Sequence, residues 1–184
     1  MVSTVKLKDA VEISLIAGGY AALTIMVAPI AYGPIQARIS DILLSLPFSR
    51  RFGLKGVIGL TVGAFLSNLA SPYGAYDMVL GTLANFTSSL LVYASRKLPF
   101  PLRISLVTGI ALGIAAVDFI IGYVLLGLIY QVPLLYGMGG VAIGEILTFG
   151  IGGYLLATGL EKRYGEGAER NDYGASQSEG KAER

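Results

Sequence analysis

The chain has neither cysteine nor histidine among its 184 residues. The absence of cysteine excludes disulfides, thiolate catalysis and cysteine-held zinc or iron–sulfur centres. The absence of histidine excludes histidine-ligated haem, the usual zinc sites and histidine proton relays. No GxxxxGK[ST] motif occurs, so the chain cannot hydrolyse ATP through a P-loop. We therefore expect no metal, no cofactor and no enzymatic activity.

Charge is also scarce. Charged residues make up 14% of the chain and hydrophobic residues 54%, and the mean hydropathy is +0.67. Many of the 25 glycines fall inside apolar runs, which transmembrane helices tolerate. This composition indicates one integral membrane domain. The net charge of +2 says nothing about nucleic acid, because the charged residues fall in expected loops and a tail, and we expect no nucleic-acid partner.

Five apolar runs are long enough to cross a hydrocarbon core, which takes about 20 residues per helix. They are 10–31, 54–70, 78–95, 102–130 and 138–160. The first run is too long for the apolar part of a signal peptide, and no small-residue cleavage site follows it. A sixth run, 35–48, could cross only as a short or sheltered helix.

The positions of Lys and Arg indicate that the sixth run does cross. Ten of the 14 basic residues lie in the regions 6–8, 50–55, 96–103 and 162–163, whereas the turns 32–34, 71–76 and 131–136 contain none. Basic residues accumulate on the cytoplasmic side. We predict an all-α bundle of six transmembrane helices, the second one short, with both termini cytoplasmic. Residues 1–164 would form this domain and 165–184 a disordered cytoplasmic tail.

Six polar side chains interrupt the apolar pattern: Arg38, Asp41, Asn68, Asp77, Asp118 and Glu145. Ionisable groups at membrane depth are costly and usually mark a functional site. A helix rise of about 1.5 Å per residue places five of them in the outer third, with Glu145 about 10 Å deep and Asp118 near mid-membrane. We predict a ligand site open to the outside, with Gln36 beside it. Five tyrosines are candidate walls: Tyr32, Tyr73, Tyr76, Tyr123 and Tyr136.

Most of these residues also have a structural interpretation. Arg38 and Asp41 lie three apart and could pair with each other on one helix face. Asp77 could be an N-cap or first-turn acid, and Asn68 could cross-link two helices. Asp118 could neutralise a helix dipole or hold a proton. Glu145 has no basic neighbour in GVAIGEILTF, so it requires a partner, a proton or a ligand.

The first apolar run carries small residues at a regular spacing. Ser14, Gly18 and Ala22 are four apart, and Ala17 and Ala21 repeat this spacing on the adjacent stripe. Such faces let helices approach closely in lipid. They predict either an interface with a partner protein or packing within the bundle.

Two segments are similar to the QueT family of membrane proteins. They are APIAYGPIQARISDILLSLPF (28–48) and GLTVGAFLSNLASPYGAYDMVLGTLANF (59–86). The family pattern runs A-P-x-x-(F/Y)-G-P-(I/V)-Q-x-R-x-S-E, then G-x-x-x-G-x-x-(L/I)-(A/S)-N and D-x-x-x-G. The resemblance covers the first half of the chain, and little beyond Gly144 and Glu145 in the second. Asp41 stands where the family has Glu, which shortens the reach of this acid.

The resemblance implies the substrate-binding (S) component of an energy-coupling factor (ECF) transporter. Its implied substrate is a queuosine or archaeosine precursor, a 7-deazaguanine. A transmembrane coupling subunit would dock on the small-residue face, and two partner ATPases would supply the energy. The substrate-binding residues that we predict from depth and residue type are Gln36, Arg38, Asp41, Asn68, Asp77 and Glu145. A carboxylate, Glu145 or Asp41, would accept the ring N–H groups, and Arg38 or Asn68 would lie near O6.

Other hypotheses remain open. A self-sufficient secondary carrier would shuttle protons through Asp118 and Glu145. An S component could also bind another small vitamin-like ligand. An intramembrane enzyme is disfavoured, because no pair of acids has an evident catalytic spacing. A purely structural subunit would pair its outer acids with basic neighbours.

Overall fold

The computed structural model describes residues 6–33 and 36–164, and all regular structure in these ranges is helical. The first elements are α1 (Leu7–Met26), the single turn α2 (Ala28–Ala31) and the 3₁₀ helix η1 (Ile39–Phe48). Next come α3 (Gly53–Asn68) and α4 (Gly74–Ser95). The predicted tail, 165–184, lies outside the described residues.

Two long helices complete the described chain, and each changes its winding. α5 (Leu102–Val117) continues into the π-helical segment η2 (Asp118–Ile129). α6 (Leu134–Glu145) continues through the π-helical segment η3 (Ile146–Gly153) and runs on to Tyr164. Wide turns of this kind often occur at functional sites. Both changes of winding coincide with a membrane acid, Asp118 or Glu145.

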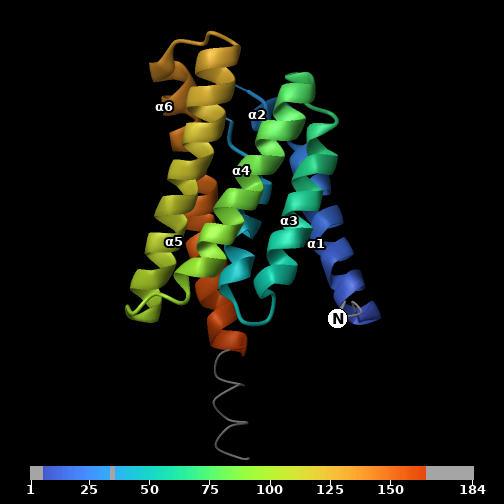
Figure 1. Ribbon diagram of the computed structural model, residues 1–184, viewed down its shortest axis with the longest axis vertical. Helices are drawn as coiled ribbons and strands as arrows, with labels where there is room; N and C mark the ends of the chain where they lie inside the picture. The colour runs from blue at the N-terminus through green and yellow to red at the C-terminus, as the bar shows by residue number, and fades with distance from the viewer. Residues whose placement is uncertain (1–5, 34–35, 165–184) are drawn as a thin grey trace, which may run out of the picture.

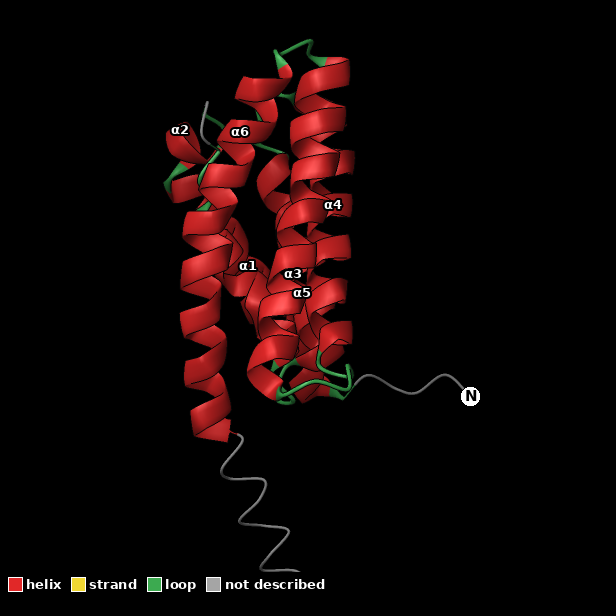
Figure 2. Cartoon of the chain, turned by 90° about the vertical axis from the view of Figure 1, so that its left-hand side faces the viewer, coloured by secondary structure: helices red, strands yellow, loops and turns green. Residues whose placement is uncertain are grey.

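The all-α prediction is confirmed. Among the described residues, four helices are long and apolar enough to cross a membrane: Leu7–Met26, Gly74–Ser95, Leu102–Ile129 and Leu134–Tyr164. Figures 1 and 2 show them aligned along the long axis of the molecule. Large apolar side chains such as Leu15, Val79 and Leu155 are exposed on the outside of the bundle. This is the surface expected of a protein whose solvent is lipid.

The short helix η1 packs inside the bundle, where it contacts α1, α3, α4 and η3. Leu44 and Phe48 are fully buried there. A 3₁₀ helix rises about 2.0 Å per residue, so the ten residues of η1 extend about 20 Å instead of about 15 Å. The residues Gln36–Arg38 before it are not helical, which adds further length. This local geometry makes the short run longer than an α-helix of the same number of residues.

Glycines of α3 let α1 approach closely. A Cβ at Gly59 would lie 2.8 Å from the Ile16 Cβ atom, and a Cβ at Gly63 would lie 2.8 Å from the backbone oxygen of Ala17. Ala17 and Ala21 are buried in this contact. Their stripe therefore packs within the bundle, and the prediction that these two alanines form a partner interface is wrong.

The other small residues of α1 lie on its outer side. Ser14, Gly18 and Ala22 are exposed. A Cβ built at Gly18 would meet nothing within 4 Å among the described residues. This stripe is the part of the predicted interface that stays accessible.

α1 begins and the last helix ends at the same end of the bundle (Figure 1), and the basic residues Arg51, Lys55 and Arg96 form ion pairs there. Arg51 makes two hydrogen bonds to Glu12, at 3.0 and 2.5 Å, and Lys55 bonds the same carboxylate at 2.6 Å. Arg96 binds both oxygens of Glu161, at 2.7 and 2.9 Å, and the backbone oxygen of Phe48 at 2.7 Å. These contacts tie α1 to α3, and η1 and α4 to the last helix.

Candidate functional site

Buried polar side chains gather around the start of η1, and we call this group the polar cluster. Its members come from α1, η1 and the residues before it, α3, α4 and α6, and each is at most 5% exposed. They are Tyr20, Thr24, Arg38, Ser40, Asp41, Ser67, Asn68, Asp77, Asn85 and Glu145. So many polar groups in a membrane bundle require a function or complete mutual pairing.

The non-helical residues Gln36–Arg38 bring Arg38 into the cluster. Gln36 has a left-handed backbone (φ 46°) and is buried, and η1 begins only at Ile39. The prediction of a helix through these three residues is therefore wrong. Non-helical backbone at membrane depth is tolerated where protein surrounds it, often at transport sites. Within the described part of the chain, the Gln36 side chain forms no hydrogen bond to the cluster.

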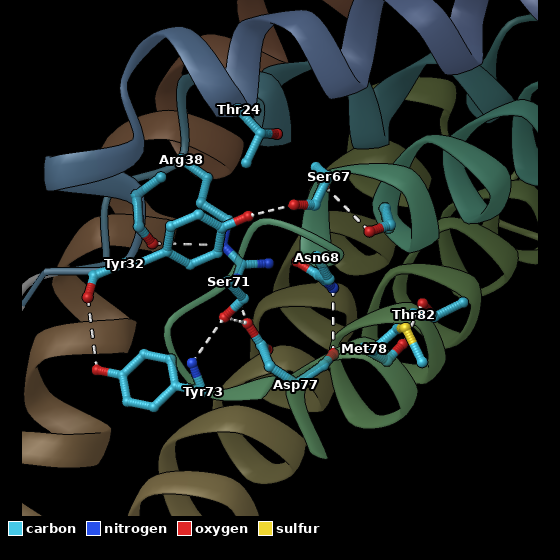
Figure 3. Close-up of polar contacts among 12 residues, drawn as sticks. Thr24, Tyr32, Arg38, Ser67, Asn68, Ser71, Tyr73, Asp77, Met78 and Thr82 are labelled. Atoms are coloured by element: carbon cyan, nitrogen blue, oxygen red, sulfur yellow. Dashed lines mark hydrogen bonds and ion pairs between the residues drawn. The ribbon is translucent and has the colours of Figure 1, made fainter. Parts of the chain in front are cut away.

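Arg38 forms an ion pair with Asp77 of α4, with 3.6 Å between Nη2 and Oδ2. Its guanidinium also lies over the Tyr32 ring, 5.2 Å from the centroid, and its Nε donates to the Ala31 oxygen at 3.4 Å. Figure 3 shows this side chain between Tyr32 and Asp77. Pairing between Arg38 and Asp41, the structural alternative, is not what the structure shows. The cation instead joins two separate elements.

Asp77 and Asn68 link α3 to α4. Asp77 lies in the first turn of α4, as predicted, and accepts a hydrogen bond from the Ser71 hydroxyl at 2.5 Å. The Asn68 amide donates to the Asp77 backbone oxygen at 3.2 Å (Figure 3). Gly81 leaves room for this amide, because a Cβ there would collide with it. Asn68 therefore cross-links two helices as the structural interpretation predicted.

Asp41 lies on the other side of the cluster, facing α1 and α6. The Tyr20 hydroxyl donates to Asp41, and the Thr24 and Ser40 hydroxyls are 2.6 Å apart. Glu145 is buried in the same cluster, at the end of α6 where η3 packs against η1. The sequence analysis missed Tyr20 and Thr24. The sequence did contain an indication of both residues, since two polar residues four apart share one face of a helix.

Glu145 and Asp118 lie at similar depths. Glu145 ends the twelve-residue α6, about 17 Å from the start of that helix, so the predicted depth of 10 Å was too shallow. Asp118 begins the twelve-residue η2, whose end lies beside the start of α6. Asp118 lies near the middle of the helix Leu102–Ile129, in agreement with the predicted position within its helix.

Two of the five candidate tyrosines, Tyr32 and Tyr73, lie against the polar cluster. Tyr76 and Tyr136 are 59% and 72% exposed, and Tyr123 stacks on the outward Phe119 with 5.5 Å between ring centroids. Those three predictions are wrong. By contrast, the Tyr32 hydroxyl donates to the Ser67 backbone oxygen at 2.9 Å. The Tyr73 hydroxyl lies 3.4 Å from the Tyr32 backbone oxygen, so these two rings cover the cluster at one end (Figure 3).

Several buried atoms of the cluster lack a hydrogen-bond partner within the described ranges. They are Asn68 Oδ1, Asp77 Oδ1, Asn85 Nδ2 and Glu145 Oε2. Buried polar atoms are almost always paired, and each unpaired one destabilises the fold by about 1–3 kcal/mol. Four such atoms from α3, α4 and α6 in one cluster are typical of a site that receives its partners from a polar ligand.

The helices and the polar interior define the class, a multi-pass α-helical membrane protein. A family model described as QueT transporter matches residues 10–162, and the chain belongs to this family. It is 29% identical over 160 residues to the protein named "Queuosine precursor transporter QueT" of Lactococcus lactis subsp. cremoris (strain MG1363). That alignment covers 82% of this chain and 91% of the relative. No solved structure matches the chain. The predicted family is confirmed.

Proposed function

We propose that the chain is the substrate-binding component of an ECF-type transporter and takes up a queuosine precursor, a 7-deazaguanine. The observation that carries the site is the convergence of four unpartnered buried polar atoms in the cluster. Family membership and the relative's printed name support the substrate. Uptake leaves the substrate chemically unchanged, so no catalytic residue is required.

The cluster offers the complement of a guanine-like edge. Glu145 Oε2 and Asn68 Oδ1 are free acceptors for ring N–H groups, and Asn85 Nδ2 is a free donor for a carbonyl oxygen such as O6. Arg38 is already engaged by Asp77, so it frames the site and strengthens its field. Asn85 is therefore a better candidate than Arg38 for the donor to O6.

We propose that six segments cross the membrane, with residues 1–164 as one domain and both ends cytoplasmic. The four long apolar helices, the length of the 36–48 segment and the basic residues at one end support this arrangement. Because the chain has no cysteine, single cysteines report orientation directly. In intact cells, an impermeant maleimide should label Gln131→Cys and spare Arg50→Cys. Equal labelling of both would contradict the orientation.

Energy would come from partners, a transmembrane coupling subunit and two ATPases. The missing P-loop and the exposed stripe of Ser14, Gly18 and Ala22 support a transporter in which separate subunits hydrolyse ATP. The alternative carrier finds support in the partner-free carboxylate oxygens of Asp118 and Glu145. Liposomes with the chain alone separate the two. The S component should bind ligand without accumulating it, whereas pH-gradient-driven uptake would establish the carrier.

Mass spectrometry of the compound that co-purifies with the protein tests the proposed identity of the ligand. We expect a 7-deazaguanine. Asn68→Ala should lose this ligand or bind it at least about tenfold more weakly, because a buried hydrogen-bonding site rejects mismatched partners strongly. Gln131→Ala, at the same end but exposed, should bind normally. A vitamin unrelated to purines would replace the proposed substrate while leaving the transporter class intact. Normal binding by Asn68→Ala would refute the assignment of the site.

A further inference from the structure

The 3₁₀ helix η1 joins the polar cluster to the opposite end of the bundle. Its first turn carries Asp41, which accepts a hydrogen bond from the Tyr20 hydroxyl of α1. Its last residue, Phe48, is fully buried, and the backbone oxygen of Phe48 accepts a hydrogen bond from Arg96 at 2.7 Å. At a rise of about 2.0 Å per residue, Asp41 and Phe48 are about 14 Å apart along the helix axis. Arg96 therefore holds η1 at the end that lies away from the polar cluster.

The winding of η1 depends on its surroundings. Runs of 3₁₀ helix longer than three or four residues are uncommon, because their hydrogen-bond geometry is poorer than that of an α-helix. η1 has ten residues, and Pro47 lacks the N–H group that would complete the ladder near its last turn. The same residues wound as an α-helix would be about 5 Å shorter. The position of Asp41 relative to Phe48 therefore depends on the contacts that maintain the 3₁₀ winding.

Closely packed glycines enclose the sides of η1. A Cβ at Gly152 of η3 would lie 2.7 Å from Cγ1 of Ile42, and a Cβ at Gly56 of α3 would lie 3.2 Å from Cγ of Pro47. A tightly packed interior is hardly compressible and transmits displacement. Sideways movement of η1 is therefore blocked, and a disturbance of its last turn is passed along its axis to Asp41.

Arg96 is the side chain that fixes this last turn. Within the described part of the chain, no other side chain outside η1 donates a hydrogen bond to the backbone of residues 43–48. Arg96 is itself held by Glu161 of the last helix, at 2.7 and 2.9 Å, and its guanidinium lies 5.2 Å from the centroid of the Phe48 ring. The side chains of Arg96 and Glu161 are 18% and 14% exposed, so water contributes little to this contact.

We propose that Arg96 is a positioning residue for the ligand site. It anchors the last residue of η1, maintains the 3₁₀ winding and thereby sets the position of Asp41 in the polar cluster, without touching the ligand itself. The inference rests on the proposed function, because it takes the polar cluster as the ligand site. A displacement of about 1 Å at such a site is enough to weaken its function strongly. Loss of the anchor should therefore weaken ligand binding from a distance.

The test is the affinity of the purified full chain for 7-deazaguanine, measured by calorimetry. Arg96→Met should bind at least about tenfold more weakly than wild type, and Arg96→Lys, which keeps a cation and its N–H donors, should recover most of the affinity. Arg51→Met is the matched control. Arg51 also makes two hydrogen bonds to a glutamate at the same end, but none of its hydrogen bonds in the described chain reaches η1. It should lower the Tm without changing the affinity. Equal loss of affinity in both methionine variants would overturn the proposal.

A double variant separates loss of the anchor from the charge that this loss leaves behind. Arg96→Met leaves Glu161 without its cation, whereas Arg96→Met with Glu161→Gln leaves no unpaired charge. Neither variant restores the hydrogen bond to the Phe48 oxygen. The double variant should therefore stay at least about tenfold weaker than wild type, and full recovery of affinity would overturn the proposal. Because it leaves no charge unpaired, the double variant also decides the question if Arg96→Met fails to fold.

Hydrogen exchange of the η1 amides needs no ligand and so separates this inference from the function beneath it. In Arg96→Met, the amides of residues 41–46 should exchange at least about tenfold faster than in wild type, and in Arg51→Met they should be unchanged. Faster exchange confined to Phe48 and the residues after it would overturn the transmission along η1. If wild type bound no 7-deazaguanine while the exchange result held, the proposed substrate would fail and the anchoring of η1 by Arg96 would stand.

Discussion

Replacing Arg38 by methionine should lower the free energy of unfolding by about 3–5 kcal/mol, because it leaves the Asp77 carboxylate buried without its cation. Both side chains are almost completely buried, at 6% and 0% exposure. Solvent therefore cannot replace the lost partner. For a chain of this size, we expect the Tm in detergent to fall by roughly 10 °C.

A double substitution tests whether the loss arises from the unpaired charge. In Arg38→Met with Asp77→Asn, no charge is left behind, and the amide still bonds the Ser71 hydroxyl. We expect the double variant to recover at least about half of the lost stability, since replacing both members of a buried pair is often nearly neutral. It should not recover ligand binding, because the geometry around Asn68 and Asp77 is altered.

Arg50→Met is the matched control, since Arg50 is exposed at the opposite end of the bundle. Exposed basic residues contribute little to stability, about 0–1 kcal/mol. Equal Tm values for Arg38→Met and Arg50→Met would show that Arg38 is not part of a buried pair. A double variant as unstable as Arg38→Met would show that packing of the arginine stem, and not charge, accounts for the loss.

Arg38 shows which part of the site the sequence predicts and which part it does not. Its isolation among apolar residues identified it, because charge at membrane depth is rare. Its partner could not be identified in the same way. Spacing along a helix suggested Asp41, but the left-handed backbone at Gln36 and the extended backbone at Arg38 take Arg38 out of that helix, and its side chain pairs with Asp77 of α4. Long-range pairing depends on that local break, which the pattern of residues did not reveal.

The depth of the acidic residues along their helices was also predicted only in part. Counting residues placed Glu145 and Asp41 in one region, and the structure buries both in the polar cluster. It failed for the depth of Glu145, because the count began at residue 138 whereas the helix begins at Leu134. Hydropathy locates apolar runs well. It does not locate the residue at which a helix begins, and an error of four residues shifts depth by about 6 Å.

A valine at Gly63 should disrupt both the fold and the site. Its Cβ would lie 2.8 Å from the Ala17 backbone oxygen and 2.9 Å from the Tyr20 Cβ, so α1 must move away from α3. Overpacking of this kind destabilises a protein by about 1–3 kcal/mol. Because Tyr20 donates to Asp41, displacement of α1 should also weaken ligand binding. We expect a lower Tm and an affinity reduced at least about tenfold.

A valine at Gly18 is the matched comparison, because the same change is made on the opposite face of the neighbouring helix. No described atom lies within 4 Å of the new Cβ, so the Tm and the ligand affinity of the isolated chain should stay at wild-type values. Under the proposed function, this variant should instead reduce co-purification with the coupling subunit, since small residues permit close helix contact in lipid.

The two valines therefore separate the roles of the two stripes of α1. If Gly18→Val lowered the Tm as much as Gly63→Val, the outer stripe would belong to the core of the bundle, and no free face would remain for a partner. If Gly63→Val reduced stability but left affinity unchanged, Tyr20 would not position Asp41 for the ligand. Loss of affinity in Gly63→Val alone, together with loss of assembly in Gly18→Val alone, would show that one helix serves the substrate on one face and the partner on the other.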